Sequence, residues 1–121
     1  DVTLAQIARE PYVMLTVDEA AHSSMKYWNQ HNATPNIKLR TSSVEAVRSL
    51  VANGQGITIL SDMVYRPWSL EGRRIEIMQT DVDIPTMDVG LAFNKTKVAT
   101  SAMRTVKTYF TNTYLSPKLQ L

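Results

Sequence analysis

Residues 41–62 read TSSVEAVRSLVANGQGITILSD, and they combine the signals of a helix, a glycine turn and a buried strand. Ser42 and Glu45 have the spacing of a capping box, in which both side chains accept hydrogen bonds from N–H groups at a helix start. Apolar side chains then recur at helical spacing, and Gly54 supplies the left-handed conformation of a helix C-terminus. The short β-branched run at 57–60 predicts a strand covered on both faces. A helix that feeds a buried strand through a tight turn is half of an α/β crossover unit.

Outside this stretch, similar patterns predict further helices and strands. Apolar residues at helical spacing indicate helices over 4–9, 20–31 and 101–110, with Thr3 and Asp18 placed to cap the first two. Short or alternating apolar runs indicate strands over 12–15, 37–40, 75–78 and 87–93. Asp62 is placed to cap a single helical turn over 63–66. The alternation of strands and helices predicts an α/β fold whose sheet is mostly parallel, with helices on both faces.

The composition bounds the classes of protein that this chain can represent. Its 121 residues, 44% of them hydrophobic, suffice for one buried core rather than two domains. The formal net charge is only +2 and the basic residues are scattered, whereas a DNA-binding face usually clusters them. The lack of cysteine excludes disulfides and cysteine catalysis, and no apolar run approaches the roughly 20 residues of a membrane span. With no visible signal peptide and no initiator Met at Asp1, we expect an internal fragment of a cytoplasmic protein.

Polar side chains follow three of the predicted strands at the point where each strand ends. Small molecules bind such sheets at the carboxyl ends of the strands, near helix N-termini, which also attract anions. The predicted binding residues of this rim are Thr16, Thr41, Ser42, Ser43, Leu60, Ser61, Asp62 and Arg66. Purely structural roles are the alternative. Ser42 then only caps a helix, Asp62 only caps a turn, and Arg66 belongs to a surface turn in which Trp68 covers the sheet edge.

No motif in the chain predicts catalysis, a metal site or a cofactor. His22 and His31 have no carboxylate or cysteine beside them at metal-ligand spacing. No serine lies in a nucleophile elbow, and no acid–base pair is recognisable. The GQG run at 54–56 lacks the third glycine and the acidic residue of a dinucleotide fingerprint. We therefore expect a protein that is not an enzyme and that binds no cofactor.

Residues 50–60, LVANGQGITIL, resemble the LVAxGxGIxxL segment of the effector-binding domain of LysR-type transcriptional regulators. Residues 4–11 are similar to the start of that domain's second lobe, residues 70–75 to its LxGRL turn and strand, and residues 101–110 to its closing amphipathic helix. The resemblance covers essentially the whole chain. It departs from the family at Ser61 and Asp62, near which family members often carry proline.

The resemblance implies one lobe of the two-lobed fold that these regulators share with type II periplasmic solute-binding proteins. Residues 1–97 would form lobe II, residues 98–115 the closing helix, and residues 116–121 a tail. In the family that helix packs on lobe I, which lies outside this chain. We therefore expect its apolar face to be exposed, filled by a neighbouring chain or covered in a rearranged way.

The implied function is that of the ligand-sensing fragment of a LysR-type regulator. A small organic effector would bind in the cleft between the lobes, against the polar rim described above. DNA would be bound only through an N-terminal winged helix-turn-helix outside this chain. The intact protein would be a homo-oligomer, a dimer or tetramer, and residues 20–31 and 37–40 resemble elements that the family uses in side-by-side dimers. The alternative is the C-terminal lobe of a periplasmic solute-binding protein.

Overall fold

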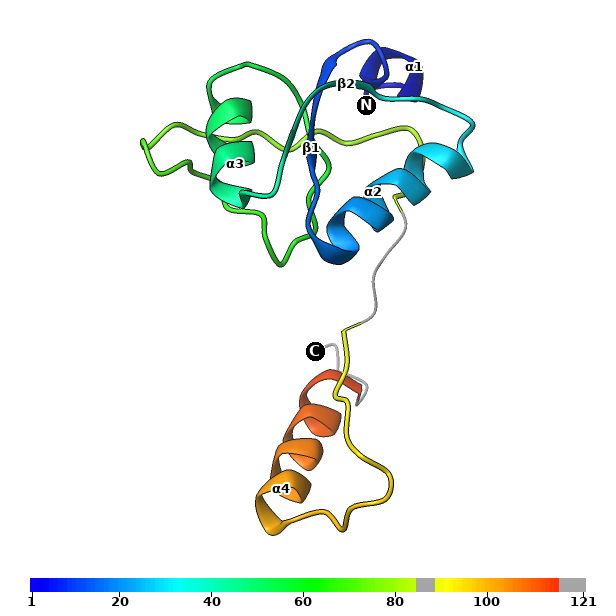
Figure 1. Ribbon diagram of the computed structural model, residues 1–121, viewed down its shortest axis with the longest axis vertical. Helices are drawn as coiled ribbons and strands as arrows, with labels where there is room; N and C mark the ends of the chain where they lie inside the picture. The colour runs from blue at the N-terminus through cyan, green and yellow to red at the C-terminus, as the bar shows by residue number, and fades with distance from the viewer. Residues whose placement is uncertain (85–88, 116–121) are drawn as a thin grey trace, which may run out of the picture. The chain divides into compact units, whose positions relative to one another are not determined.

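The computed structural model describes residues 1–84 and 89–115, without the side chains of residues 18–20, and it divides into two units, Asp1–Met87 and Asp88–Leu121. The described elements of the first unit are α1 (Leu4–Ile7), β1 (Pro11–Leu15), α2 (Asp18–Gln30), β2 (Asn36–Thr41) and α3 (Val44–Ala52) (Figure 1). Those of the second unit are α4 (Ser101–Phe110) and a π-helical turn, η1 (Thr111–Leu115). The first unit therefore has the α/β order that the sequence predicts.

Strand β1 is the middle of the sheet. It pairs in parallel with β2, from Pro11 opposite Asn36 to Leu15 opposite Thr41. On its other edge a single parallel bridge joins Tyr12 to Ile57. The Ile57 N–H donates to the Pro11 carbonyl at 2.8 Å, and the Ile57 carbonyl accepts from Val13 N–H at 2.9 Å. The segment after α3 thus runs alongside β1 in the predicted direction.

Helix α2 covers one face of β1 with aromatic side chains. Tyr12 and Met14 point to this face and are buried against Tyr27 and Trp28. The Trp28 ring meets those of Tyr12 and Tyr27 edge-on, with centroid separations of 5.6 and 5.5 Å. This geometry is favourable for aromatic pairs. The cluster is the larger of the two halves of the core.

Helix α3 covers the opposite face of the same strand. Val13 and Leu15 alternate with the residues of the α2 face and pack on Val47, which is fully buried. Figure 1 shows α2 and α3 on either side of the strands. Because both faces are covered, four consecutive residues of β1 are buried, as is typical of parallel strands. The predicted parallel sheet with helices on both faces is confirmed.

The predicted helices are all present, but their starts and ends differ in detail. Helix α1 ends at Ile7 rather than at residue 9, and α2 begins at Asp18 with Val17 in the N-cap position. The predicted capping box of α3 is wrong, because Ser43 is the N-cap and its Oγ accepts from Ala46 N–H at 3.1 Å. The shift of one residue has a local cause. Thr41 Oγ1 accepts from Ser43 N–H at 3.1 Å, and this turn brings Ser43, not Ser42, to the helix start.

The buried strand predicted over 57–60 is wrong in extent, since only its first residue makes a bridge and all four residues are half-buried. Side chains of the segment and of β1 replace further ladder hydrogen bonds. Thr58 Oγ1 donates to the Val13 carbonyl at 2.8 Å, and the Ile59 N–H donates to the Tyr12 hydroxyl at 3.3 Å. The run lies where it was predicted, but it is held by side chains.

The strands predicted over 75–78 and 87–93 are also wrong. Residues 75–78 lie between two isolated bridges, Trp68 with Arg74 and Val2 with Thr80, and form none themselves. Residues 89–93 are exposed and form no bridge with another described residue, and Met87 lies outside the described residues. Alternating apolar residues form a strand only where a neighbour supplies hydrogen bonds and a covering face. Among the described residues, Ile75 has such support, since it is buried and its N–H donates to the Pro67 carbonyl at 2.8 Å. Residues 76–78 and 89–93 are exposed and have none.

The second unit consists of α4 and the segments around it. Thr100 caps the helix, since its Oγ1 accepts from Met103 N–H at 3.2 Å. The predicted apolar stripe is present and exposed, with Met103, Val106 and Phe110 at 42%, 48% and 40% exposure. Among the described residues, no helix combines the length and the apolar character that a bilayer crossing requires.

Candidate functional site

The carboxyl ends of β1 and β2 meet at one corner of the sheet. Thr16 N–H donates to the Thr41 carbonyl at 2.9 Å, one residue beyond the last paired residue of β1. Thr41 in turn accepts the Ser43 N–H through its hydroxyl. Thr16, Ser42 and Ser43 are exposed, and Thr41 is half-buried. The structure thus brings together four of the predicted binding residues.

The segment after α3 reaches the same edge of the sheet at Leu60. The Leu60 side chain packs on the cluster of Val13, Leu15 and Val47, so the chain leaves the core beside the end of β1. The next residues form a turn in which Val64 and Tyr65 N–H both donate to the Ser61 carbonyl at 3.0 Å. The bond from Tyr65 has the i to i+4 spacing of a helical turn, so the predicted single turn is present but lies earlier in the chain than residues 63–66.

The two charged residues of this turn are exposed. The Ser61 carbonyl, rather than the Asp62 carboxylate, accepts the N–H groups that close the turn, so the predicted capping role of Asp62 is wrong. Arg66 donates from Nη1 to the carbonyl of Tyr65 at 2.9 Å. Trp68 is 53% exposed, and the Arg74 guanidinium lies 5.9 Å from its ring centroid. The Asp62 carboxylate and the Arg66 guanidinium are therefore both accessible at this turn.

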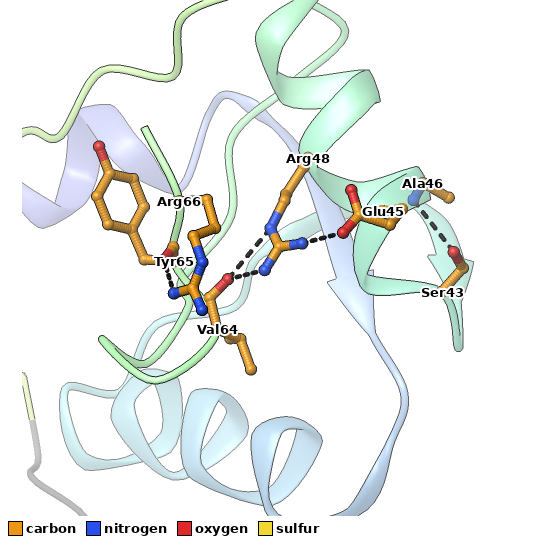
Figure 2. Close-up of polar contacts among 7 residues, drawn as sticks. All are labelled: Ser43, Glu45, Ala46, Arg48, Val64, Tyr65 and Arg66. Carbon is orange, nitrogen blue, oxygen red and sulfur yellow. Dashed lines mark hydrogen bonds and ion pairs between the residues drawn. The ribbon is translucent and has the colours of Figure 1, made fainter. Parts of the chain in front are cut away.

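A buried arginine, which the sequence analysis did not single out, attaches this turn to α3. Arg48 is only 9% exposed, and its Nε donates to the Val64 carbonyl at 3.1 Å. Its Nη2 donates to the same oxygen, and its Nη1 forms an ion pair with Glu45 (Figure 2). The signal was present in the sequence, because Arg48 stands within the apolar stripe between Val44 and Val51. A cation at such a position needs partners in the fold.

The next residue of α3 makes a second attachment. Ser49 Oγ donates to the Glu71 carboxylate, in the turn where Gly72 adopts a φ of 78°. Hydrogen bonds from Ser49, and then from Ser69, hold the pKa of the Glu71 carboxyl below its usual value. Consecutive residues of one helix thus fix two different turns.

This second attachment predicts a pH effect. Because the pKa of Glu71 is lowered in the folded state, the contact stabilises the fold above the pKa of the unfolded carboxyl, and its contribution is lost as pH falls through the folded pKa. Ser49→Ala should raise the Glu71 pKa toward its usual value, as measured by NMR titration of the carboxyl carbon. Ser42→Ala is the matched control and should leave that pKa unchanged. Equal Glu71 pKa values in the wild type and in Ser49→Ala would contradict the assignment.

The start of α3 is the electropositive part of the rim. The Ser43 side chain satisfies Ala46 N–H, and the Ser43 carbonyl accepts from Val47 N–H. The N–H groups of Val44 and Glu45, in the first two helical positions, have no acceptor within a helix. Aligned peptide dipoles add a partial positive charge there. In chemical terms this corner is suited to an anionic group, with a carboxylate and a guanidinium exposed on the neighbouring turn.

The described residues contain no group of three or more side chains of the kinds that hold metal ions. What the geometry defines is an α/β domain whose polar groups gather at the carboxyl ends of parallel strands, where such folds bind small molecules. The profile of the LysR substrate binding domain family matches residues 1–114. The chain therefore belongs to that family of domains, which has a fold like that of the periplasmic binding proteins and occurs in transcriptional regulators. This match favours the regulator over a periplasmic solute-binding protein.

Solved structures agree with the fold. HinK, a LysR family transcriptional regulator from Pseudomonas aeruginosa, is 23% identical over 90% of this chain and 38% of its own, with a TM-score of 0.80. The PA01 protein from Pseudomonas aeruginosa, assigned provisionally to the same family of regulators, is 23% identical over 71% of this chain and 30% of its own, with a TM-score of 0.62. The chain therefore spans 38% or less of either regulator. A comparison with curated protein sequences found no match.

Proposed function

We propose that this chain is the effector-binding lobe II of a LysR-type transcriptional regulator and that its rim binds a small organic anion. The observation that carries the proposal is that three polar segments lie at one edge of the sheet, beside the start of α3. These segments are Thr16, residues 41–43 and residues 61–62. The family match supports the regulatory role. The N–H groups at the start of α3, the exposed hydroxyls of Thr16, Ser42 and Ser43, and the exposed guanidinium of Arg66 support an anion.

Each predicted residue has a role in this proposal. The N–H groups at the start of α3 bind the anionic group, and Thr16, Thr41, Ser42 and Ser43 surround it. Asp62 accepts from an amine or hydroxyl of the effector, and Arg66 pairs with a second acidic group. Leu60 and Ser61 line the floor between these positions. The binding residues are therefore Thr16, Thr41, Ser42, Ser43, Leu60, Ser61, Asp62 and Arg66.

In the intact protein the effector acts through a shift between arrangements of the oligomer. It changes their populations only if it binds one arrangement more tightly than the other. We propose a cytoplasmic homodimer or tetramer that binds DNA through a helix-turn-helix outside this chain, with residues 1–97 as lobe II and 98–115 as the helix that packs on lobe I. No residue of this chain has a catalytic role in the proposal, and no cofactor takes part.

The role of Ser43 can be separated from its capping role by one substitution. Aspartate caps a helix about as well as serine, so Ser43→Asp should change the free energy of unfolding by less than about 0.5 kcal/mol. Its carboxylate would stand where the effector anion binds and would repel it. We expect Ser43→Asp and Asp62→Ala to lose the effector response of the full-length protein while both still bind DNA.

The measurement is thermal stabilisation of the full-length protein by a metabolite library, followed by DNA binding with each hit. A ligand at 100 times its dissociation constant adds about 2.7 kcal/mol to the free energy of unfolding, which is readily detected. Thr34→Ala, at an exposed position before β2, is the control and should respond as the wild type does. If both Ser43→Asp and Asp62→Ala respond as fully as the wild type, the binding residues are wrongly assigned.

A further inference from the structure

Two arginines approach the turn at residues 61–65, and they differ in what they leave accessible. Arg66 is exposed, and among the described residues its guanidinium reaches only the carbonyl of its neighbour, Tyr65. Arg48 comes from α3, is nearly buried, and places three of its nitrogens on partners within the protein. Figure 2 shows its side chain lying between Glu45 and Val64. The charge of Arg48 is thus used inside the fold.

The guanidinium of Arg48 joins this turn to α3. The turn is closed on itself by the N–H groups of Val64 and Tyr65, both donated to the Ser61 carbonyl. The carbonyl of Val64 faces outward from that loop, toward α3, and receives both Nε and Nη2 of Arg48. Two donors on one oxygen fix direction as well as distance, which a lysine ammonium on a flexible stem does not do. Movement of α3 and movement of the turn are therefore coupled.

The same guanidinium controls the charge at the start of α3. Glu45 lies in the first turn of the helix, next to the N–H groups that the proposed function assigns to an anion. An unpaired carboxylate there would bind the free N–H groups at the positive end of the helix dipole or would repel an external anion. Arg48 neutralises it by an ion pair across one turn of the helix. The helix start is thereby kept available for an external anion.

We infer that Arg48 is a positioning residue of the effector site, which rests on the function proposed above. It holds the turn that carries Ser61 and Asp62 against α3, and it keeps the carboxylate of Glu45 away from the anion. It does not touch the effector itself. Two properties follow that a general stabilising role would not produce: a local effect confined to the turn, and a charge effect that a second substitution reverses.

The local effect is tested by hydrogen exchange of the full-length protein. Arg48→Lys keeps the positive charge but loses the two-donor contact with Val64, so the amides of Val64 and Tyr65 should exchange at least about tenfold faster. That is the scale expected on losing a hydrogen bond from a charged group. Arg40→Lys, at an exposed position of β2, is the control and should leave both amides unchanged. Unchanged exchange in Arg48→Lys, or an equal increase in the amides of β1, would overturn the inference.

The charge effect is tested with acetate and sulfate as probe anions, followed by NMR shifts of the Val44 and Glu45 amides. Arg48→Met should weaken binding of these anions roughly two- to fivefold at low ionic strength, the effect of one charge near a helix end. Arg48→Met combined with Glu45→Gln should regain the affinity while its turn amides remain fast to exchange. If the double variant binds no better than Arg48→Met, the charge role is wrong.

The hydrogen-exchange and anion-binding experiments also separate this inference from the proposed function. Should neither anion shift the two amides in the wild type, the anion site of the proposed function fails. Hydrogen exchange in Arg48→Lys still decides whether the arginine positions the turn.

Discussion

Replacement of Trp28 by alanine is expected to lower the free energy of unfolding by about 3–5 kcal/mol, the usual cost of truncating a buried tryptophan. Trp28 has no exposed surface, and it stands between Tyr12 of β1 and Tyr27 of its own helix. Its removal leaves a cavity in the larger half of the core and frees α2 from the sheet. Since whole domains are stable by about 5–15 kcal/mol, this variant should be close to unfolding.

Two further variants make the result specific. Trp28→Phe should cost clearly less than Trp28→Ala, because it keeps a ring and removes an indole N–H that has no partner among the described residues. Trp68→Ala, at a 53% exposed position, should cost about 1 kcal/mol or less, including its contact with Arg74. Urea unfolding followed by circular dichroism gives all three values. Similar losses for Trp28→Ala and Trp68→Ala would show that the core is wrongly described.

Replacement of Gly56 by alanine is the second large effect that we expect. An added Cβ would lie 2.5 Å from the Pro11 carbonyl oxygen and 3.3 Å from a methyl group of Val13. The first contact is with backbone, which cannot rotate away, so the segment after α3 would have to separate from β1. We expect a loss of about 3 kcal/mol, the upper end of the usual range for overpacking.

Gly90→Ala is the matched control, because no atom of the described residues lies within 4 Å of its added Cβ, and its cost should stay within about 0.5 kcal/mol. Gly54→Ala is a second comparison, with open space but a φ of 73°, and should cost about 1–2 kcal/mol through backbone strain alone. The loss of free energy of unfolding should therefore be largest for Gly56→Ala, smaller for Gly54→Ala and smallest for Gly90→Ala. Hydrogen exchange at Ile57 and Val13 should accelerate only in Gly56→Ala. Unchanged hydrogen exchange at the bridge between Tyr12 and Ile57 in that variant would contradict the packing described here.

Local patterns predicted the helices and the centre of the sheet because those signals are short in range. The stripe of α3, its stop at Gly54 and the apolar run of β1 each carry their own evidence in neighbouring residues. The cap of α3 was misplaced by one residue, since a hydrogen bond from Ser43 N–H to Thr41 Oγ1 decides which serine stands at the helix start. The spacing of apolar residues along the sequence does not predict such a hydrogen bond.

The outer strands were predicted wrongly for a different reason. The alternation from residue 87 to 93 describes side chains, whereas a strand also needs a partner, and residues 89–93 have none in the described structure. The rim could be predicted because parallel strands bring their carboxyl ends to one edge. Arg48 could not, because its partner Val64 is 16 residues away and offers a backbone carbonyl, which every residue carries.

The central claim is that this rim binds a small organic anion, and a crystal structure of the full-length protein with a stabilising metabolite tests it most directly. We predict an acidic group of the metabolite on the N–H groups of Val44 and Glu45, with Asp62 or Arg66 in contact with the rest of the molecule. A metabolite bound elsewhere, with the start of α3 and the turn at residues 61–65 untouched, would contradict the account.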